Sequence, residues 1–214
     1  MSSRKKVQYV EELTINIRKH GYTVHRILGE GGFGKVMELE QADGTRVAGK
    51  VAVTNGRMVN MNDLRKEAEC HTKATHGNVV KLLEYWEEAR GIVLIMELAL
   101  GSLQDIMEER AEHRGTFTED EILAVAKCTA GALSFLHARG LIHRDVKPGN
   151  ILQYGPRFFK VSDFGLSKFV SFKETTSTWC GTPGYMAPEI YRRNSYTAAV
   201  DAYAGDHHVS ATAV

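Results

Sequence analysis

The spacing of apolar residues divides the chain into two parts with different patterns. In the first part, from Tyr22 to about residue 97, apolar and polar residues alternate over short segments, which is typical of β-strands. Asp43-Gly44 is a hairpin turn signal, and residues 62–75 carry a helical pattern. The strand segments lie at residues 24–28, 35–40, 47–51, 79–85 and 92–96. The pattern therefore predicts a small antiparallel sheet with one helix.

The second part of the chain has a mainly helical pattern. Thr118, with Glu121 three residues later, matches a capping box, which begins a helix that runs towards Gly140. Short strand-like segments follow at residues 151–152 and 159–161. A sheet-rich first part followed by a helix-rich second part predicts an α+β fold of two lobes.

Composition narrows the classes of partner and compartment. The 214 residues include 27 basic and 26 acidic side chains, which give a formal net charge of +1. This balance argues against nucleic acid or an anionic membrane as a main partner, so we expect neither. The first ten residues lack the apolar stretch of a signal peptide. Three scattered cysteines, Cys70, Cys128 and Cys180, indicate reduced thiols, and we expect a cytoplasmic or nuclear protein.

A glycine-rich segment separates the first two predicted strands. Its sequence is Gly29-Glu30-Gly31-Gly32-Phe33-Gly34, and Val36 follows. Glycines let the backbone approach phosphates and direct N–H groups at them, although a flexible hairpin explains this pattern equally well. A dinucleotide-binding fold would place a helix after the glycines, whereas here a strand follows. The pattern therefore argues against a dinucleotide-dependent oxidoreductase.

A lysine in an apolar strand needs an anionic partner, because an unpaired buried ammonium is costly. Lys50 is such a residue, since it follows Val47-Ala48-Gly49. Phosphates on one side and a carboxylate on the other would satisfy it. Glu67, in the predicted helix, is the candidate carboxylate, and Glu69 is the fallback.

Three further motifs specify the chemistry. They are His143-Arg144-Asp145-Val146-Lys147-Pro148-Gly149-Asn150, then Asp163-Phe164-Gly165, and finally Ala187-Pro188-Glu189. Together with the glycine segment and Lys50, they resemble the motif set of protein kinases. The pairing of Lys147 with Pro148, and the segment from Gly181 to Glu189, are similar to those of the serine/threonine class. We therefore identify the chain as a member of the eukaryotic serine/threonine protein kinases.

This resemblance implies a role for each motif in phosphate transfer from ATP, with Mg²⁺, to a protein serine or threonine hydroxyl. Asp145 would accept or orient the hydroxyl proton, and Lys147 would neutralise charge on the transferred phosphate. Asn150 and Asp163 would hold Mg²⁺ through oxygen ligands. Lys50 and Glu67 would complete the catalytic set.

The resemblance also implies where ATP makes its contacts. The expected binding residues are Gly29, Glu30, Gly31, Gly32, Phe33, Gly34, Val36, Ala48, Lys50, Glu97, Ala99 and Leu152. Met96 would be the gatekeeper residue beside the adenine. The chain departs from the family pattern at His71, four residues after Glu67, where kinases usually carry an apolar residue.

Residues 163–189 are similar to a kinase activation segment. One interpretation is that its hydroxyl residues simply form a polar loop with no regulatory role. However, Thr178 lies where similar kinases carry an activating phosphate. We expect an upstream kinase to act there, with Arg144 as the residue that pairs with the phosphate. The same resemblance implies that Thr182 contacts Asp145 and Lys147. Asp201 corresponds to the residue that ties a central helix to the catalytic segment.

The resemblance covers residues 22 to 205, which leads to a four-part division. We expect a leader (1–21), a kinase N-lobe (22–97), a partial C-lobe (98–205) and an unrelated tail (206–214). On this basis we expect a kinase truncated in its C-lobe, and a shifted reading frame is one hypothesis for the tail. The alternative function is a truncated, non-catalytic regulatory fragment that still binds nucleotide.

Overall fold

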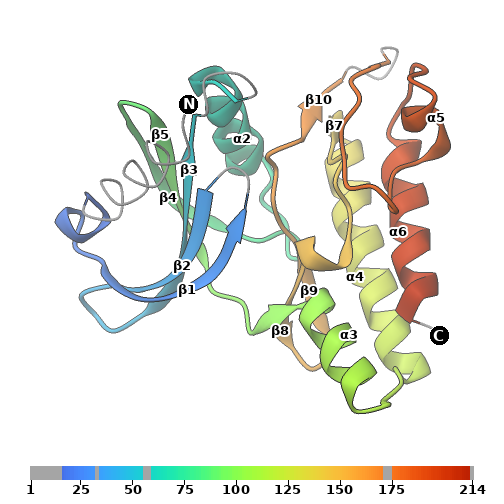
Figure 1. Cartoon of the computed structure of the whole chain (residues 1–214), viewed down its shortest axis with the longest axis horizontal. Coiled ribbons are helices and arrows are strands. Elements are labelled where there is room, and N and C mark those ends of the chain that lie inside the picture. Colours follow the sequence, from blue (N-terminus) through green and yellow to red (C-terminus); the bar gives the residue numbers. More distant parts are fainter. Residues whose placement is uncertain (1–15, 32–33, 55–58, 171–174, 213–214) are drawn as a thin grey trace. The chain divides into compact units, whose positions relative to one another are not determined.

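A computed structural model describes residues 16–31, 34–54, 59–170 and 175–212, with side chains as far as residue 206. The chain forms two compact units (Figure 1). The sheet unit contains the described residues up to Thr72 together with Lys81–Leu98. The helical unit contains Lys73–Val80 and the described residues from Ala99 onwards.

The sheet unit is built on one antiparallel sheet with the strand order β1-β2-β3-β5-β4. Each strand pairs with its neighbour in antiparallel register. The strands are β1 (Thr23–Gly31), β2 (Gly34–Glu40), β3 (Arg46–Val53), β4 (Leu82–Glu88) and β5 (Gly91–Glu97). The predicted sheet with one following helix, α2 (Met61–Lys73), is confirmed.

The central strands β3 and β5 are buried on both faces. On one face, Leu64 and Ala68 of α2 pack against Ala52, Ile92 and Leu94. The opposite face has its own apolar cluster of Ile17, Tyr22, Met37, Leu39, Val47, Val51, Val53, Val93 and Ile95. Burial on both faces explains why β5 is apolar at consecutive positions instead of alternating.

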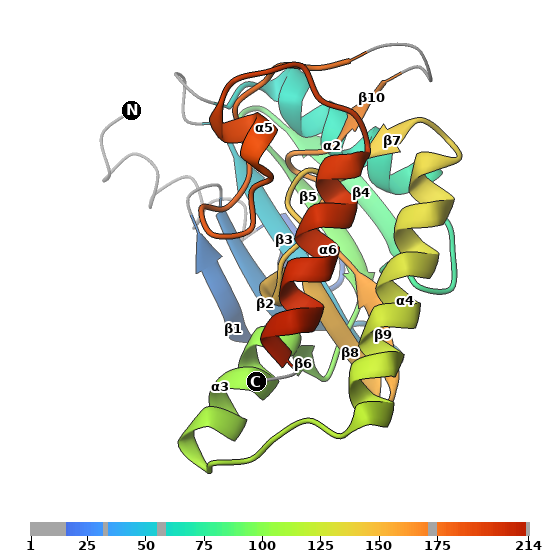
Figure 2. The same cartoon turned by 90° about the vertical axis from the view of Figure 1, so that its right-hand side faces the viewer.

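The helical unit combines helices with two small sheets (Figure 2). Its helices are α3 (Leu103–Glu112), α4 (Glu119–His137), the short α5 (Pro188–Tyr191) and α6 (Ala199–Thr212). One sheet has the order β6-β8-β9, from Gly101–Ser102, Ile151–Gly155 and Phe158–Val161. The other pairs β7 (Leu141–Ile142) with β10 (Lys168–Phe169). Helices α4 and α6 pack against each other.

The start of α4 follows the sequence prediction. Thr118 is the N-cap residue, and its side chain accepts a hydrogen bond from the Glu121 backbone, while the Glu121 carboxylate accepts one from the Thr118 backbone. Arg110 donates two hydrogen bonds to that carboxylate, at 2.7 and 3.0 Å. This contact lowers the pKa of Glu121 to about 2, because ionised Glu121 is the form that Arg110 stabilises.

Two regions differ from the sequence-based expectations. Residues 79–85 were expected to form one strand, but β4 begins at Leu82. Val79 instead makes an isolated parallel bridge to Val161 of β9 in the helical unit. Helices α3 and α5 had no counterpart in the sequence prediction, and the helix α6 continues to Thr212. Among the described residues, no helix combines the length and the apolar composition needed to cross a membrane.

Candidate active site

Lys50 and Glu67 form an ion pair inside the sheet unit. Lys50 Nζ lies 2.7 Å from Glu67 Oε1, and their side chains are 16% and 7% exposed. Glu67 falls on the buried face of α2 with Leu64 and Ala68, because residues three and four positions apart share one side of a helix. The fallback, Glu69, is exposed. The structure thus places the first candidate carboxylate, and not the fallback, against Lys50.

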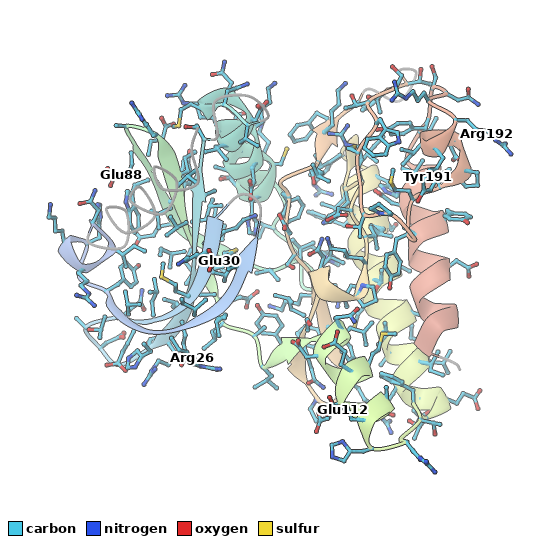
Figure 3. All side chains as sticks on the ribbon, in the orientation of Figure 1. Arg26, Glu30, Glu88, Glu112, Tyr191 and Arg192 are labelled. Atoms are coloured by element: carbon cyan, nitrogen blue, oxygen red, sulfur yellow. The ribbon has the colours of Figure 1, made fainter. Side chains whose placement is uncertain are left out.

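The glycine segment is described at its two ends, and Gly32 and Phe33 lie outside the described residues. At Gly34, an added Cβ would lie only 1.7 Å from the Val51 carbonyl oxygen, so the fold itself requires glycine there. At Gly29, an added Cβ would meet no atom within 4 Å. Neither packing nor backbone conformation within the described chain requires glycine at position 29. Glu30, labelled in Figure 3, lies 3.5 Å from Lys35 across the hairpin.

In the helical unit, Asp201 holds the backbone of the catalytic segment, residues 143–150. Asp201 lies in the first turn of α6 and is 1% exposed. Its Oδ1 accepts a hydrogen bond from Arg144 N at 2.7 Å, and its Oδ2 accepts from His143 N at 2.8 Å. His137 Nε2, at the end of α4, donates to the same Oδ2 at 2.8 Å. These donors satisfy a carboxylate that would otherwise be costly to bury.

His143 fixes the orientation of the peptide that carries Asp145. The imidazole is fully buried and its Nε2 lies 2.9 Å from the Ser162 carbonyl oxygen. Asp145 N donates to His143 Nδ1 at 3.3 Å. Because Nδ1 accepts this bond, these partners assign the ring proton to Nε2, which donates it to Ser162. The catalytic segment is therefore tied both to α6 and to the residue that precedes Asp163.

The Asp145 carboxylate is surrounded by donors from three residues. Thr182 Oγ1 donates to Oδ1 at 2.7 Å, while Lys147 Nζ lies 2.9 Å from Oδ2. Asn150 Nδ2 donates to the same Oδ2 at 3.0 Å and to the Asp145 carbonyl at 2.8 Å. Lys147 Nζ also donates to Thr182 Oγ1 at 2.7 Å. A carboxylate, an ammonium and a hydroxyl thus meet at one point, as the resemblance implied for Thr182.

The two candidate metal ligands flank the β8–β9 hairpin in sequence and therefore lie at its open end, where Ser162 N donates to the Asn150 carbonyl at 2.9 Å. Asn150 ends a short 3₁₀ turn before β8, and its amide nitrogen is occupied by Asp145. Within the described chain no donor contacts its Oδ1, so this oxygen is available to a cation. Asp163 follows β9 with a φ of +64°, and its Oδ1 accepts a hydrogen bond from Gly165 N. No cluster of three or more His, Cys, Asp and Glu residues suited to a metal occurs in the described residues.

This geometry agrees with the comparison to known proteins. The family model described as the protein kinase domain matches residues 22–206. The chain belongs to the protein kinase family. It is 34% identical over 183 residues to the serine/threonine-protein kinase TIO of Arabidopsis thaliana, which covers 84% of the chain and 14% of that protein.

Two other kinases of known sequence show similar identity. A probable myosin light chain kinase of Dictyostelium discoideum is 36% identical over 190 residues, covering 84% of the chain and 52% of that protein. The calcium/calmodulin-dependent protein kinase type 1 of Caenorhabditis elegans is 33% identical over 187 residues, covering 85% and 53%. The kinase chain therefore spans about half the length of these two relatives.

The residues expected to contact adenine are distributed over both units of the kinase. Val36, Ala48 and Glu97 belong to the sheet unit, where Ala48 pairs with Met96 across β3 and β5. The Glu97 carboxylate accepts a hydrogen bond from Lys81 N at 2.6 Å. Ala99 and Leu152 belong to the helical unit, where Leu152 pairs with Ser102 and Lys160. His71, the departure from the family pattern, is 4% exposed on α2.

The activation segment is described at residues 163–170 and 175–189, and Ser171 lies outside the described residues. Thr178 is exposed, and its Oγ1 lies 3.5 Å from that of Thr176, which accepts a hydrogen bond from Lys168 Nζ at 3.1 Å. The segment ends at α5, where the Tyr191 hydroxyl accepts from Gly184 N at 3.2 Å. Arg192, the residue that follows this short helix, projects outward (Figure 3).

Sequence reasoning missed two residues that support the catalytic segment: His137, which contacts Asp201, and Tyr196, which contacts Arg144. His137 lies four positions after Leu133 on α4, so a polar side chain on an apolar helix face was the available signal. Tyr196 contacts Arg144 through its hydroxyl, at 3.4 Å from Nη1. Nothing in the local pattern distinguishes Tyr196 from other loop residues, so only the folded chain identifies it.

Proposed function

We propose that this chain is a protein serine/threonine kinase that transfers the γ-phosphate of ATP to a hydroxyl of a protein substrate, with Mg²⁺ as cofactor. The observation that carries the proposal is the contact of Asp145 with Lys147, Thr182 and Asn150. Phosphoryl transfer depends on positioning and charge neutralisation more than on covalent chemistry with the protein. This group of side chains supplies both.

Each residue of this group has a distinct role in the proposed reaction. Asp145 orients the substrate hydroxyl and takes its proton as the bond from that oxygen to the γ-phosphorus forms. The bond from the γ-phosphorus to the bridging oxygen breaks, and ADP leaves. Lys147 offsets the negative charge of the transferred group. Thr182 holds Asp145 and Lys147 in this arrangement, since its hydroxyl donates to one and accepts from the other.

Asn150 and Asp163 fit the ligand chemistry of Mg²⁺. This ion prefers oxygen ligands and is usually held by one or two protein groups together with phosphate oxygens and water. The Oδ1 of Asn150, which no donor among the described residues contacts, suits this role. The bound ion would neutralise charge on the phosphates of ATP. Asp163 adopts a left-handed backbone conformation that is costly for a non-glycine residue, and such strain is typical of functional positions.

Two observations in the sheet unit support the expected contacts with ATP. Glycine at position 29 has no structural cause within the described chain, which is the result expected if the space above it receives phosphates. Lys50 is positioned by Glu67 to contact the phosphates. The remaining proposed contacts are Glu30, Gly31, Gly32, Phe33, Gly34, Val36, Ala48, Glu97, Ala99 and Leu152.

We also propose that an upstream kinase phosphorylates Thr178. Thr178 is exposed, and the Arg144 guanidinium has no carboxylate partner in the described part of the chain. A phosphate on Thr178 would supply that negative charge. Intact mass measurement of the active protein, followed by peptide mapping of residues 175–182, tests this. Fully active protein without phosphate in this peptide would disprove the proposal.

The proposed activity is tested by transfer of radiolabelled phosphate from ATP and Mg²⁺ to a generic serine/threonine substrate. We expect Asp145→Asn to reduce transfer by at least a hundredfold. Asp120→Asn is the matched control, because Asp120 is 63% exposed and pairs only with Arg157 among the described residues. Its transfer should equal that of the unaltered chain. No transfer by any variant, with ATP still raising the melting temperature, would favour the non-catalytic nucleotide-binding alternative.

We also propose a compartment and partners for the kinase. The three cysteines are all free thiols, which supports a reducing, cytoplasmic or nuclear environment. The proposed protein partners are a substrate that carries serine or threonine and the upstream kinase.

A further inference from the structure

The Tyr196 hydroxyl connects three parts of the helical unit. The ring is buried, with 3% of the residue exposed. The hydroxyl donates a hydrogen bond to the Thr178 carbonyl at 2.7 Å and lies 3.4 Å from Arg144 Nη1 and 3.7 Å from Cys180 Sγ. The Tyr196 backbone also exchanges two hydrogen bonds with Thr176, at 2.8 and 3.1 Å. One residue therefore holds the activation segment by its backbone and by its side chain.

Arg144 is the point at which the activation segment meets the catalytic segment. It immediately precedes Asp145, and its backbone N donates to Asp201. Its φ of +68° is unfavourable for a residue with a side chain, so surrounding contacts must maintain it. The guanidinium contacts are the Leu166 carbonyl, at 2.5 Å from Nε, and the Tyr196 hydroxyl.

The protonation state of the Tyr196 hydroxyl determines which hydrogen bond it donates and which it accepts. Burial raises the pKa of Tyr196 above its usual value of 10, so the hydroxyl keeps its proton near neutral pH. That proton is donated to the Thr178 carbonyl, and a lone pair of the same oxygen accepts from Arg144. These contacts therefore connect Arg144, which is next to Asp145, with Thr178, which is proposed to carry the phosphate.

We propose that Tyr196 is a positioning residue. Through its hydroxyl, it couples the activation segment to the catalytic segment while Thr178 is unphosphorylated. The inference rests on the proposed function. A phosphate on Thr178 would bind Arg144 through charge-assisted hydrogen bonds, which are about twice as strong as neutral ones. The phosphate would then couple the two segments itself, and loss of the Tyr196 hydroxyl would lower kcat less.

Tyr196→Phe tests this proposal because it removes only the hydroxyl and keeps the buried ring. We expect the kcat of the unphosphorylated chain to fall about tenfold, which corresponds to the net free energy of about one hydrogen bond. We expect the KM for ATP to stay constant. In the Thr178-phosphorylated chain the fall in kcat should be less than about twofold. An equal loss in both forms would overturn the proposal, because it would indicate a merely structural role.

Tyr85→Phe is the matched control, since Tyr85 is 43% exposed on β4 and belongs to the other unit. It should leave kcat unchanged in both forms. A Tyr85→Phe effect equal to that of Tyr196→Phe would also overturn the proposal.

Hydrogen exchange separates this inference from the proposed function. The amides of Thr176 and Tyr196 each donate to the carbonyl of the other residue, so their exchange reports the attachment of the segment. In the unphosphorylated chain, Tyr196→Phe should speed their exchange at least tenfold, and Tyr85→Phe should not. If no variant transfers phosphate and the exchange responds in this way, the coupling stands and the proposed function fails. Unchanged exchange would overturn the coupling.

Discussion

The two units place charged side chains by different means. In the sheet unit, Lys50 and Glu67 are carried by a strand and a helix, and each lies on the buried face that the period of its element dictates. In the helical unit, Asp145 and Asp163 lie in segments outside regular elements. There the positions depend on the hydrogen bonds that Asp201 accepts from the His143 backbone and on the one that the His143 ring donates to Ser162. Regular elements position a side chain by repetition, whereas loops need partners that are distant in sequence.

This difference determines how each part of the site should respond to mutation. Loss of one partner in the sheet unit leaves a buried charge but keeps the strand and helix, because their apolar contacts remain. Loss of one partner in the helical unit removes hydrogen bonds from the backbone itself. We therefore expect larger effects in the helical unit.

The largest effect is expected from Asp201→Ala in the helical unit. The change leaves the backbone N–H groups of His143 and Arg144 without their acceptor, and removes the acceptor of His137. Loss of a buried, hydrogen-bonded carboxylate of this kind lowers the free energy of unfolding by about 3–5 kcal/mol. Urea denaturation would measure the loss. A change below about 1 kcal/mol would contradict the proposed role of Asp201 in holding this segment.

A smaller effect is expected from Glu67→Gln in the sheet unit. Lys50 would lose its ionised partner, but its side chain remains partly exposed, so the expected loss is about 1–3 kcal/mol in the free energy of unfolding. Glu69→Gln is the matched control on the exposed side of α2 and should change stability by less than about 0.5 kcal/mol. Equal effects of the two substitutions would contradict the distinction between the buried and exposed faces.

Gly49→Ala tests the packing behind Lys50. An added Cβ would lie 2.4 Å from Leu39 Cδ1, and overpacking of a core typically costs about 1–3 kcal/mol. Because Leu39 is a side chain that can rotate, we expect a value near the lower limit. Gly77→Ala is the control, since its added Cβ meets no atom within 4 Å. Thermal melts of both variants would show whether Gly49 is required by the core.

The smallest effect is expected at Glu121 and depends on pH. Its pKa is lowered from 4.5 to about 2 by Arg110, so its ionised form stabilises the folded chain at pH values above about 4.5. This contribution should diminish as the pH falls from 4.5 towards 2, where Glu121 becomes protonated. Glu121→Gln should therefore cost about 1 kcal/mol at pH 6 and almost nothing near pH 2. Chemical denaturation of both proteins at several pH values would measure the difference, and a cost that does not vary with pH would contradict it.

Much of the sheet unit could be predicted from the chain alone. The alternation of apolar residues located the strands, and the helical pattern of residues 62–75 located the helix that carries Glu67, the first candidate partner of Lys50. These arguments succeed because a strand or helix repeats its geometry at every residue. The boundary at Leu82 was missed because Val79 pairs with Val161, which is distant in sequence.

The sequence by itself determined the kinds of chemical group present, through motifs such as the segment from His143 to Asn150, and it determined the family. The tertiary structure alone decided which of these groups touch. His137 reaches Asp201 across 64 positions and Tyr196 reaches Arg144 across 52, and the first of these contacts depends on the packing of α4 against α6. Such contacts depend on the path of the whole chain, and no local period records them.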